Sequence, residues 1–398
     1  MTKMAIMGYG VVGSGIYDIV TKNAETITKK IGEKLEVKYI LDIRDFESHP
    51  EKHLFVKNAD VIAEDSEVTL VAEAMGGITF AYEFTKKMLE AGKSVVTSNK
   101  ELVSKKGTEL FEIAKRKNVA YMFEAAVGGG IPIIRPLVNC LAANNINSIH
   151  GIINGTTNYI LTKMFKENQS FEVALSDAQK LGYAEQDPTA DVEGFDTMRK
   201  ISILTALASG WETDDEKIPR EGITKITAED VKCAEKLNSS VKLIGYSKLE
   251  GGKVTARVCP MIIPKENPLY SVEDVFNAIL VNGDMVDDVM MYGRGAGKEA
   301  TASAVVGDLM DVVRHKGQFD KNFSWTIEKE GAFNNPSDEV NKFLVRSSNT
   351  NDEITKVFGK VCFVEGVDGA FVTNQMTEKE FEEKSAKCTI LSKIRIFE

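Results

Sequence analysis

The alternation of apolar and polar positions divides the first third of the chain into short strands and amphipathic helices. Five apolar runs predict strands, at 3–8, 35–42, 68–75, 93–98 and 119–125. The stretches between them, such as TFAYEFTKKMLEAG from Thr79, repeat apolar residues at helical spacing. Strands that alternate with helices in this way predict an α/β fold with a doubly wound parallel sheet of the Rossmann type.

The pattern changes near residue 131 and predicts a second, α+β domain. A Gly-Gly-Gly run is followed by a helix, a strand at 148–154 and three helical stretches. Two more strands are expected around 242–249 and 253–263, with Pro260 and Pro264 marking strand ends. The turn GRGAGKEA then precedes an apolar helix, TASAVVGDLMDVV, which could return to cover the first sheet.

The last sixty or so residues predict a small separate domain. Strand and helix patterns follow one another in the order βαββαβ, which is a ferredoxin-like plan. The polar stretch EKEGAFNNPSDE before them, at 328–339, is predicted to be a linker. The expected domains are therefore 1–135 with 293–318, 136–292 and 340–398.

A charged pair interrupts the helical stretch that ends at Ala208. Lys200 falls on the same helical face as Ile203, Leu204 and Leu207, and Asp196 precedes it by one turn. One interpretation is a surface pair that stabilises the helix by about 0.3–0.5 kcal/mol. The other is a buried ammonium kept for chemistry, which Asp196 would hold charged and oriented.

Composition excludes several classes of function. A length of 398 residues is enough for two or three domains. With 49 basic and 59 acidic residues, a net charge of −10, the chain is a poor partner for nucleic acid or an anionic membrane, so a small molecule is expected. The five scattered cysteines form no CxxC pair, and no apolar run approaches the ~18 residues that span a bilayer. We expect a cytoplasmic protein without structural zinc.

The motif GYGVVG follows the first predicted strand and opens a helix, the context of a dinucleotide site. Gly8 would permit the tight turn, Gly10 the approach of a pyrophosphate, and Gly13 close packing of helix on strand. A glycine-rich turn without a ligand is the alternative. At the end of the second strand, Asp42 would favour NAD and Arg44 would favour NADP, unless Arg44 is an ordinary surface arginine. The sequence does not settle the choice between the two cofactors, and we lean to NADP.

Several polar stretches fall at strand ends or helix starts, where such sheets bind ligands. They are TSNKEL with Asn99 and Lys100, FEAAVGGGIP with Glu124, NGTTN at 154–158, and the pair Glu185 and Asp191. A carbonyl that accepts hydride becomes an alkoxide, which needs a proton or a fixed cation. Because none of the four histidines lies in these motifs, lysine is the expected donor.

Six motifs in this order resemble homoserine dehydrogenase: GYGVVG, TSNKEL, EAAVGGGIPII, GIINGTTNYIL, DPTADVEGFDTMRK and GRGAGKEATASAVVGDL. The resemblance covers roughly residues 3–315. It implies NAD(P)-dependent interconversion of L-homoserine and L-aspartate 4-semialdehyde, in the biosynthesis of threonine and methionine. It also implies a homodimer, or a homotetramer, built through the sheet of a substrate-binding and dimerisation domain at 136–292.

The resemblance also implies a role for individual residues. Catalysis is assigned to Lys200, Asp196 and Lys100, with either lysine as the proton donor, and substrate binding to Glu185, Asp191, Gly155 and Thr156. Cofactor contacts are assigned to Gly8, Gly10, Val11, Val12, Gly13, Arg44, Asn99, Lys100 and Gly297. A monovalent cation, Na⁺ or K⁺, is assigned to Glu124 with the carbonyls of Val127, Gly129 and Ile131. From the residues alone, Glu124 followed by Gly128, Gly129 and Gly130 favours a tight turn over a cation site.

Two differences from the family pattern and two alternative functions bear on this assignment. Glu101 replaces the alanine of many relatives. Residues 340–398 resemble an ACT regulatory domain, but the turn SSNTNDE lacks the glycine of an effector loop, so a structural or oligomerising role is expected at least as much as control by threonine. An acyl-phosphate-forming semialdehyde dehydrogenase would need a thiolate, and Cys140 lies in a predicted helix. A non-catalytic cofactor-binding regulator would have a broken lysine and carboxylate set.

Overall fold

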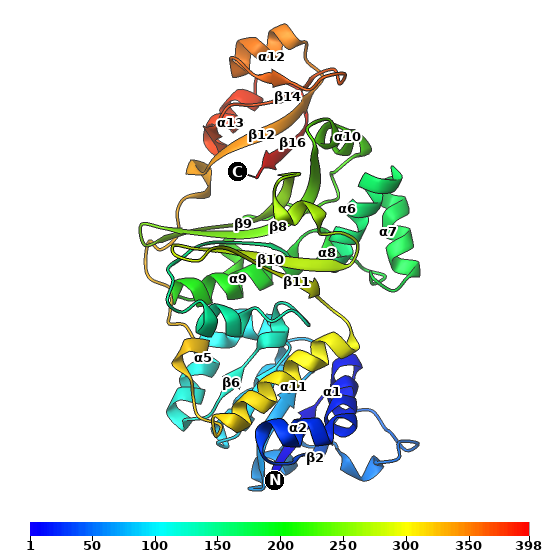
Figure 1. The fold of residues 1–398 in the computed structure, drawn as a ribbon, viewed down its shortest axis with the longest axis vertical. Helices are drawn as coiled ribbons and strands as arrows, with labels where there is room; N and C mark the ends of the chain where they lie inside the picture. Colours follow the sequence, from blue (N-terminus) through cyan, green and yellow to red (C-terminus); the bar gives the residue numbers. More distant parts are fainter. Residues whose placement is uncertain (398) are drawn as a thin grey trace. The chain divides into compact units, whose positions relative to one another are not determined.

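The computed structural model describes residues 1–397, which fold into two compact units. The first unit consists of Met1–Asn144, Ser202–Asp215 and Gly293–Glu328. The second consists of Asn145–Ile201, Glu216–Tyr292 and Lys329–Glu398. Each unit is built on its own sheet (Figure 1). The three domain ranges expected from the sequence stay predictions.

The sheet of the first unit has six parallel strands in the order β3-β2-β1-β4-β5-β6, which confirms the Rossmann-like prediction. The strands are β1 (Thr2–Met7), β2 (Leu35–Leu41), β3 (Phe55–Val56), β4 (Val68–Glu73), β5 (Ser94–Thr97) and β6 (Tyr121–Met122). The central strands are buried on both faces, because helices cover both. Their near-continuous apolar runs made them predictable, whereas the two-residue β3 was missed.

The helices of the first unit are α1 (Val11–Lys22), α2 (Ala24–Ile31), α3 (Ala59–Glu64), α4 (Thr79–Glu90), α5 (Lys100–Lys117) and α11 (Lys298–Arg314), with short helical turns η1 (Lys52–Leu54), η2 (Glu124–Ala126), η3 (Pro136–Cys140) and η6 (Lys321–Phe323). Although distant in sequence, α1 and α11 lie side by side (Figure 1). A Cβ added to Gly15 would lie only 2.9 Å from the Cβ of Ala302, and Lys298 pairs with Asp18 at 2.8 Å. The glycine therefore allows this close packing.

The second unit contains a mixed sheet in the order β11-β10-β7-β8-β9-β16-β12-β14-β13, with β15 paired to β12. The strands are β7 (Ile146–Ile152), β8 (Ser239–Glu250), β9 (Lys253–Pro264), β10 (Phe276–Gly283), β11 (Asp287–Arg294), β12 (Val340–Ser347), β13 (Cys362–Phe363), β14 (Ala370–Val372), β15 (Met376–Thr377) and β16 (Ile390–Ile396). Its core contains Ile152, Ile244, Tyr246 and Met261. The long β8–β9 hairpin turns at Gly251 and Gly252, both with positive φ.

The helices of the second unit are α6 (Gly155–Glu167), α7 (Phe171–Lys180), α8 (Thr189–Val192), α10 (Ala228–Lys236), α12 (Asn351–Phe358) and α13 (Glu378–Ser385), with short turns η4 (Asp215–Lys217), η5 (Pro268–Ser271) and η7 (Pro336–Asp338) at or within its bounds. Helix α9 (Phe195–Ser209) begins in the second unit and continues into the first. Its beginning packs on β8, where a Cβ on Gly245 would lie 2.8 Å from the Thr197 methyl.

Pro260 does not mark a strand end, so that expectation was wrong. Strand β9 runs through it to Pro264, with Pro260 opposite Leu243 of β8. Two residues earlier, the amide of Val258 points away from β8 and donates to the Pro219 carbonyl at 2.9 Å. Because alternate residues point the same way, the nitrogen of Pro260 also faces away from β8, and the hairpin loses no hydrogen bond.

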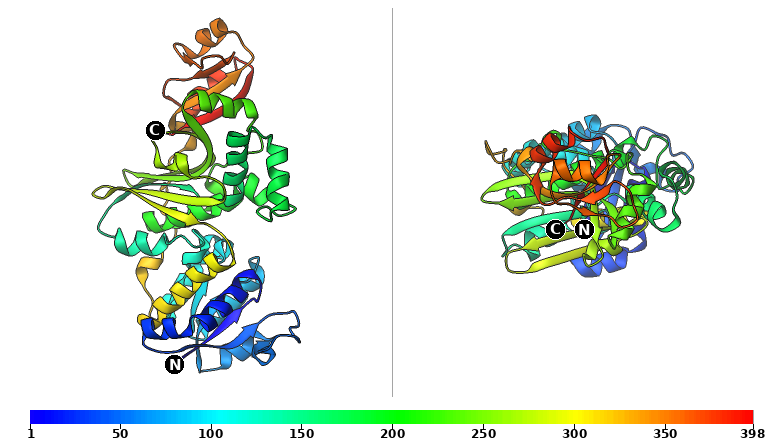
Figure 2. Two further views of the ribbon diagram at one scale, coloured as in Figure 1. Left: turned by 45° about the vertical axis from the view of Figure 1, so that its right-hand side comes forward. Right: turned by 90° about the horizontal axis from the view of Figure 1, so that it is seen from above.

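The C-terminal residues continue the sheet of the second unit. Strand β16 pairs in parallel with β9, with Arg395 opposite Met261, and the amide of Phe397 donates to the Ile262 carbonyl at 2.9 Å. Figure 2 shows this C-terminal part, in orange and red, beside the green strands of the hairpin. The expected linker is also bonded to β9, because Val254 donates to Ala332 and accepts from Asn334, each at 2.8 Å.

Within residues 1–397, no helix combines the length and apolarity needed to cross a bilayer. The five cysteines are free thiols.

Candidate active site

The glycine turn after β1 is shaped for close backbone approach. Gly8 has φ +93°, and a Cβ there would lie 2.8 Å from the Ala74 carbonyl oxygen. A Cβ on Gly13 would lie 1.9 Å from the Gly8 carbonyl oxygen, which no side chain could tolerate. Gly10 caps α1 and has open space where its Cβ would be, while Val11 is exposed. The first turn of α1 is therefore accessible to an anion such as a pyrophosphate.

At the end of β2, Asp42 and Arg44 form one connected group with the glycine turn. Asp42 accepts from the Tyr9 amide at 2.8 Å and from the Arg44 guanidinium at 2.8 and 3.0 Å. The hydrogen bond from Arg44 lowers the pKa of Asp42 to about 2. Arg44 also donates to the Tyr9 carbonyl and borders a surface cavity lined by Lys52 and Lys57. Both sequence candidates for reading the cofactor's ribose are thus brought together.

The Asn-Lys motif is anchored by a buried carboxyl at the end of β4. Asn99 caps α5 by accepting from the Leu102 amide at 3.1 Å, and its side chain donates to the Gly77 carbonyl at 2.6 Å. Its own amide donates to the Thr97 hydroxyl at 2.9 Å, and that hydroxyl donates to Glu73. Glu73 is fully buried, and burial raises its pKa to about 7. Lys100 is the first residue of α5, so this chain of bonds fixes its backbone.

Glu124 lies at the centre of a buried charge cluster in the first unit. Its carboxylate accepts from the amides of Ile133, Ile134 and Arg135 at 2.6–2.8 Å, and from the Arg135 guanidinium at 3.3 Å. Arg135 also pairs with Asp308 at 3.2 Å, and burial raises the pKa of Asp308. Both oxygens of Glu124 are therefore occupied by protein donors, and a cation there would be held by main-chain carbonyls.

In the second unit, Lys200 is buried and held by two oxygens. It is 9% exposed, and its ammonium donates to Asp196 and to the Ile153 carbonyl, each at 2.7 Å. The prediction that this lysine lies on a buried face of α9 is therefore confirmed. The carbonyl belongs to the residue after β7, so the strand end and the helix together fix the position of the nitrogen.

Asn154 links Lys200's partner to a second carboxylate. Its amide group donates to Asp191 at 2.7 Å and to Asp196 at 3.0 Å, while its carbonyl oxygen caps α6 at the Thr157 amide. Burial raises the pKa of Asp191, and the nearby charge of Asp196 raises it further. The Asn154 amide group therefore joins Asp191 to the carboxylate that holds the Lys200 ammonium.

The remaining substrate candidates differ in their surroundings. Gly155 and Thr156 are the first residues of α6, and the Thr156 hydroxyl donates to the Tyr183 carbonyl at 2.7 Å. Glu185 is exposed, and its main-chain carbonyl accepts from Gln179 at 3.1 Å. Gly297, another cofactor candidate, caps α11 with φ +120° and is exposed.

Sequence reasoning missed the roles of Glu73 and Asn154. A signal for Glu73 existed in VTLVAE, where a single carboxyl ends an apolar strand. Asn154 was noted only as part of the polar stretch at 154–158, because its two carboxylate partners are 37 and 42 residues away in the chain.

Comparisons with known proteins agree on one family. Residues 132–310 match the family model described as homoserine dehydrogenase, and residues 8–124 match its NAD-binding domain model. A homoserine dehydrogenase of Neisseria gonorrhoeae is 42% identical over 78% of this chain and 72% of its own length.

Solved structures agree. A homoserine dehydrogenase from Thiobacillus denitrificans is 34% identical with a TM-score of 0.92, over 100% of this chain and 98% of that one. A hyperthermophilic archaeal homoserine dehydrogenase in complex with NADPH is 28% identical with a TM-score of 0.68, over 79% of this chain and 98% of that one.

Proposed function

Because the chain belongs to the homoserine dehydrogenase family, we propose that Lys200 is the proton donor of its reaction. That reaction is the NAD(P)-dependent interconversion of L-homoserine and L-aspartate 4-semialdehyde, an oxidation or reduction at a CH–OH group in threonine and methionine biosynthesis. The observation that supports the proposal is the buried ammonium of Lys200, held by Asp196 and the Ile153 carbonyl.

The residues of the second unit suit the ends of such a substrate. In the reducing direction the aldehyde oxygen gains negative charge, and the Lys200 ammonium supplies a proton to it. Asp191, with Glu185, would bind the substrate's ammonium, because burial and the nearby charge of Asp196 raise the pKa of Asp191, and a cation beside it would stabilise its charged form. Gly155 and Thr156 open α6, whose N-terminus favours the substrate carboxylate. Lys100 is the alternative donor.

The test is turnover of L-aspartate 4-semialdehyde with NADPH or NADH, followed by cofactor absorbance. Lys200→Met is expected to lower kcat by about 100- to 10,000-fold with cofactor affinity unchanged. Lys163→Met is the matched control, because Lys163 and Glu167 have the same i to i+4 spacing at a more exposed position. Near-normal turnover in Lys200→Met, with loss in Lys100→Met, would transfer the role to Lys100.

The cofactor turn and the cation loop supply the remaining binding groups. The nicotinamide of a bound cofactor would supply the hydride in the reducing direction. The pyrophosphate of that cofactor would be held by Gly8, Gly10, Val11, Val12 and Gly13. Further contacts would come from Asn99, Lys100 and Gly297. We favour NADP, because Arg44 borders a cavity with Lys52 and Lys57 that suits a 2′-phosphate. A monovalent cation, Na⁺ or K⁺, would be held by carbonyls of Glu124, Val127, Gly129 and Ile131.

The edge of the second sheet supports assembly as a homodimer or homotetramer. Exposed apolar side chains gather on the β10–β11 hairpin, namely Met285, Val286, Met290 and Tyr292. Such a patch at a sheet edge favours contact with a second copy of the chain. Free cysteines support a cytoplasmic location.

The order of the strands within residues 340–398 supports the assignment of this segment as an ACT-like domain. Counted in sequence, the four main strands lie in the order 4-1-3-2, with β16 first and β13 last. Their own core contains Phe343, Phe358 and Phe371. Because β16 is also bonded to β9, we propose a structural role for this segment rather than control by threonine.

A further inference from the structure

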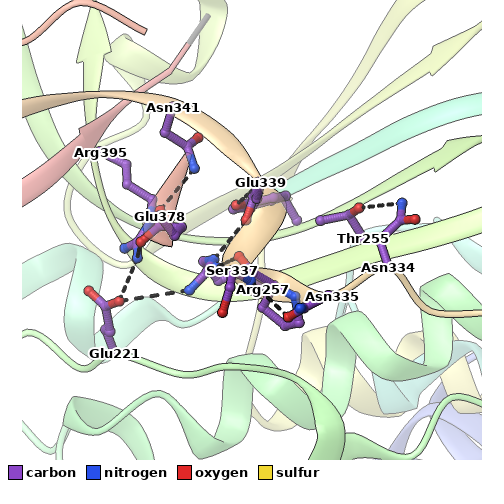
Figure 3. A network of polar contacts seen from close by, with 12 residues as sticks. Glu221, Thr255, Arg257, Asn334, Asn335, Ser337, Glu339, Asn341, Glu378 and Arg395 are labelled. Atoms are coloured by element: carbon purple, nitrogen blue, oxygen red, sulfur yellow. Dashed lines mark hydrogen bonds and ion pairs between the residues drawn. The ribbon is translucent and has the colours of Figure 1, made fainter. Parts of the chain in front are cut away.

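The segment at 219–224 lies between the C-terminal strand and the loop that carries the site carboxylates. It follows β9 on the side away from β8, because Glu221 donates its amide to the Val258 carbonyl at 2.8 Å. Figure 3 shows Glu221 pointing toward Arg395 and Arg257. None of these three residues belongs to the candidate active site.

On one side, Glu221 is held by the C-terminal strand. Arg395 of β16 is 1% exposed; it donates to both oxygens of Glu378 at 2.6 and 2.8 Å and pairs with Glu221 at 2.8 Å (Figure 3). A buried guanidinium with two carboxylate partners is fixed in position, since leaving the guanidinium unpaired in the interior is costly. Glu221 is thus tied to a rigid strand.

On the other side, the same segment holds the connection between α8 and α9. A Cβ on Gly222 would lie 2.4 Å from the Val192 carbonyl oxygen, and the Ile223 amide donates to that oxygen at 2.8 Å. Arg220 donates to the Glu193 carbonyl, and its guanidinium lies 3.4 Å from the centre of the Phe195 ring. The 219–224 segment therefore contacts Val192, Glu193 and Phe195 of this connection.

This connection sets the positions of the two site carboxylates. Asp191 is the residue before Val192, and Asp196 is the residue after Phe195. The turn between them depends on Gly194, which has φ +80°. A shift of the connection would therefore move Asp191 and Asp196 relative to Asn154, which bonds to both.

We propose that Glu221 and Arg395 are positioning residues for the reaction: the C-terminal strand holds the α8–α9 connection, and thus Asp191 and Asp196, in the geometry that binds substrate. The inference rests on the proposed function of these carboxylates. It gives the C-terminal strand a part in substrate binding that requires no effector.

The test compares Glu221→Gln, Arg395→Met and Arg395→Lys in the full-length chain. Glu221→Gln and Arg395→Met are expected to lower kcat/KM for homoserine by about 10- to 100-fold, mainly through a higher KM. NADPH affinity, measured by fluorescence titration, is expected to stay the same. Arg395→Lys keeps the charge and is expected to recover part of the loss. Calorimetric titration with homoserine checks binding independently of turnover.

Arg346→Met is the matched control. Arg346 lies on β12 and pairs at 2.9 Å with the buried Asp230 of α10, which follows the 219–224 segment by six residues and is not one of its bonding partners described above. It should lower the melting temperature without raising the KM. Glu221→Gln should remain folded because Glu221 is 39% exposed. A folded Glu221→Gln with wild-type KM and homoserine affinity overturns the inference, whereas an inactive wild-type chain overturns the proposed function instead.

Discussion

Glu73→Gln is expected to make the first unit more stable at alkaline pH. Glu73 is fully buried at the end of β4, and burial raises its pKa from 4.5 to about 7, although bonds from Thr97 and Met75 oppose the shift. Between these two pH values the folded chain binds more protons than the unfolded chain, so stability is lost as pH rises. A shift of this size corresponds to about 3 kcal/mol, fully lost above the folded pKa.

Glutamine removes this titration with little change of shape. Its carbonyl can accept from the Met75 amide, as Glu73 does at 2.7 Å, and the Thr97 hydroxyl can turn to accept from its amide group. The difference in unfolding free energy between variant and wild type should therefore move by about 3 kcal/mol in favour of the variant from about pH 4 to about pH 9. Asp308, also buried, affects both profiles equally and cancels in the difference.

Tryptophan fluorescence during urea unfolding is the assay. Both tryptophans of the chain, Trp211 and Trp325, belong to the first unit, so their signal follows that unit. Trp325 is buried and packs on Phe111 with ring centres 4.7 Å apart. Thr97→Val, which removes the bond that lowers the pKa of Glu73, should move the wild-type transition to higher pH. Parallel profiles for wild type and Glu73→Gln would refute the reasoning.

Three further changes test the binding surfaces. Arg44→Ala should raise the KM for NADPH by about tenfold or more while changing that for NADH little, and equal effects would contradict the 2′-phosphate assignment. Gly13→Ala should abolish cofactor binding, because its Cβ would lie 1.9 Å from the Gly8 oxygen; retained NADPH affinity in a fluorescence titration would exclude that role. Met290→Asp with Tyr292→Asp should halve the mass in sedimentation, and an unchanged mass would place the interface elsewhere.

Local pattern predicted the elements of both units better than their pairing. Strands such as β4 and β5 carry apolar runs because helices cover both sheet faces, and those runs are visible in the sequence. The parallel pairing of β16 with β9 joins Arg395 to Met261, far apart in the chain, and neither strand's pattern encodes it. The prediction for Pro260 was wrong for the same reason, because a proline costs a strand a hydrogen bond only where its nitrogen faces the paired neighbour.

The site was predictable where burial itself was the signal. Lys200 could be placed on a buried face of α9 because apolar residues surround it at helical spacing. The amide bridge from Asn154 to Asp191 and Asp196 could not, because it depends on the backbone of the α8–α9 connection. That connection is in turn held by Arg220, which donates to the Glu193 carbonyl. Nothing in the sequence around Arg220 indicated this contact.

The burial of the Asp196–Lys200 pair contradicts the interpretation of these two residues as a surface pair. A surface pair at this spacing stabilises a helix by about 0.3–0.5 kcal/mol, as expected for Lys163 and Glu167. Asp196 and Lys200 are only 10% and 11% exposed at their side chains, so their desolvation costs more than a surface pair would recover. Apolar residues of similar volume would serve stability at least as well. The burial of the pair is therefore consistent with the proposed role of Lys200 as proton donor, which the Lys200→Met variant tests.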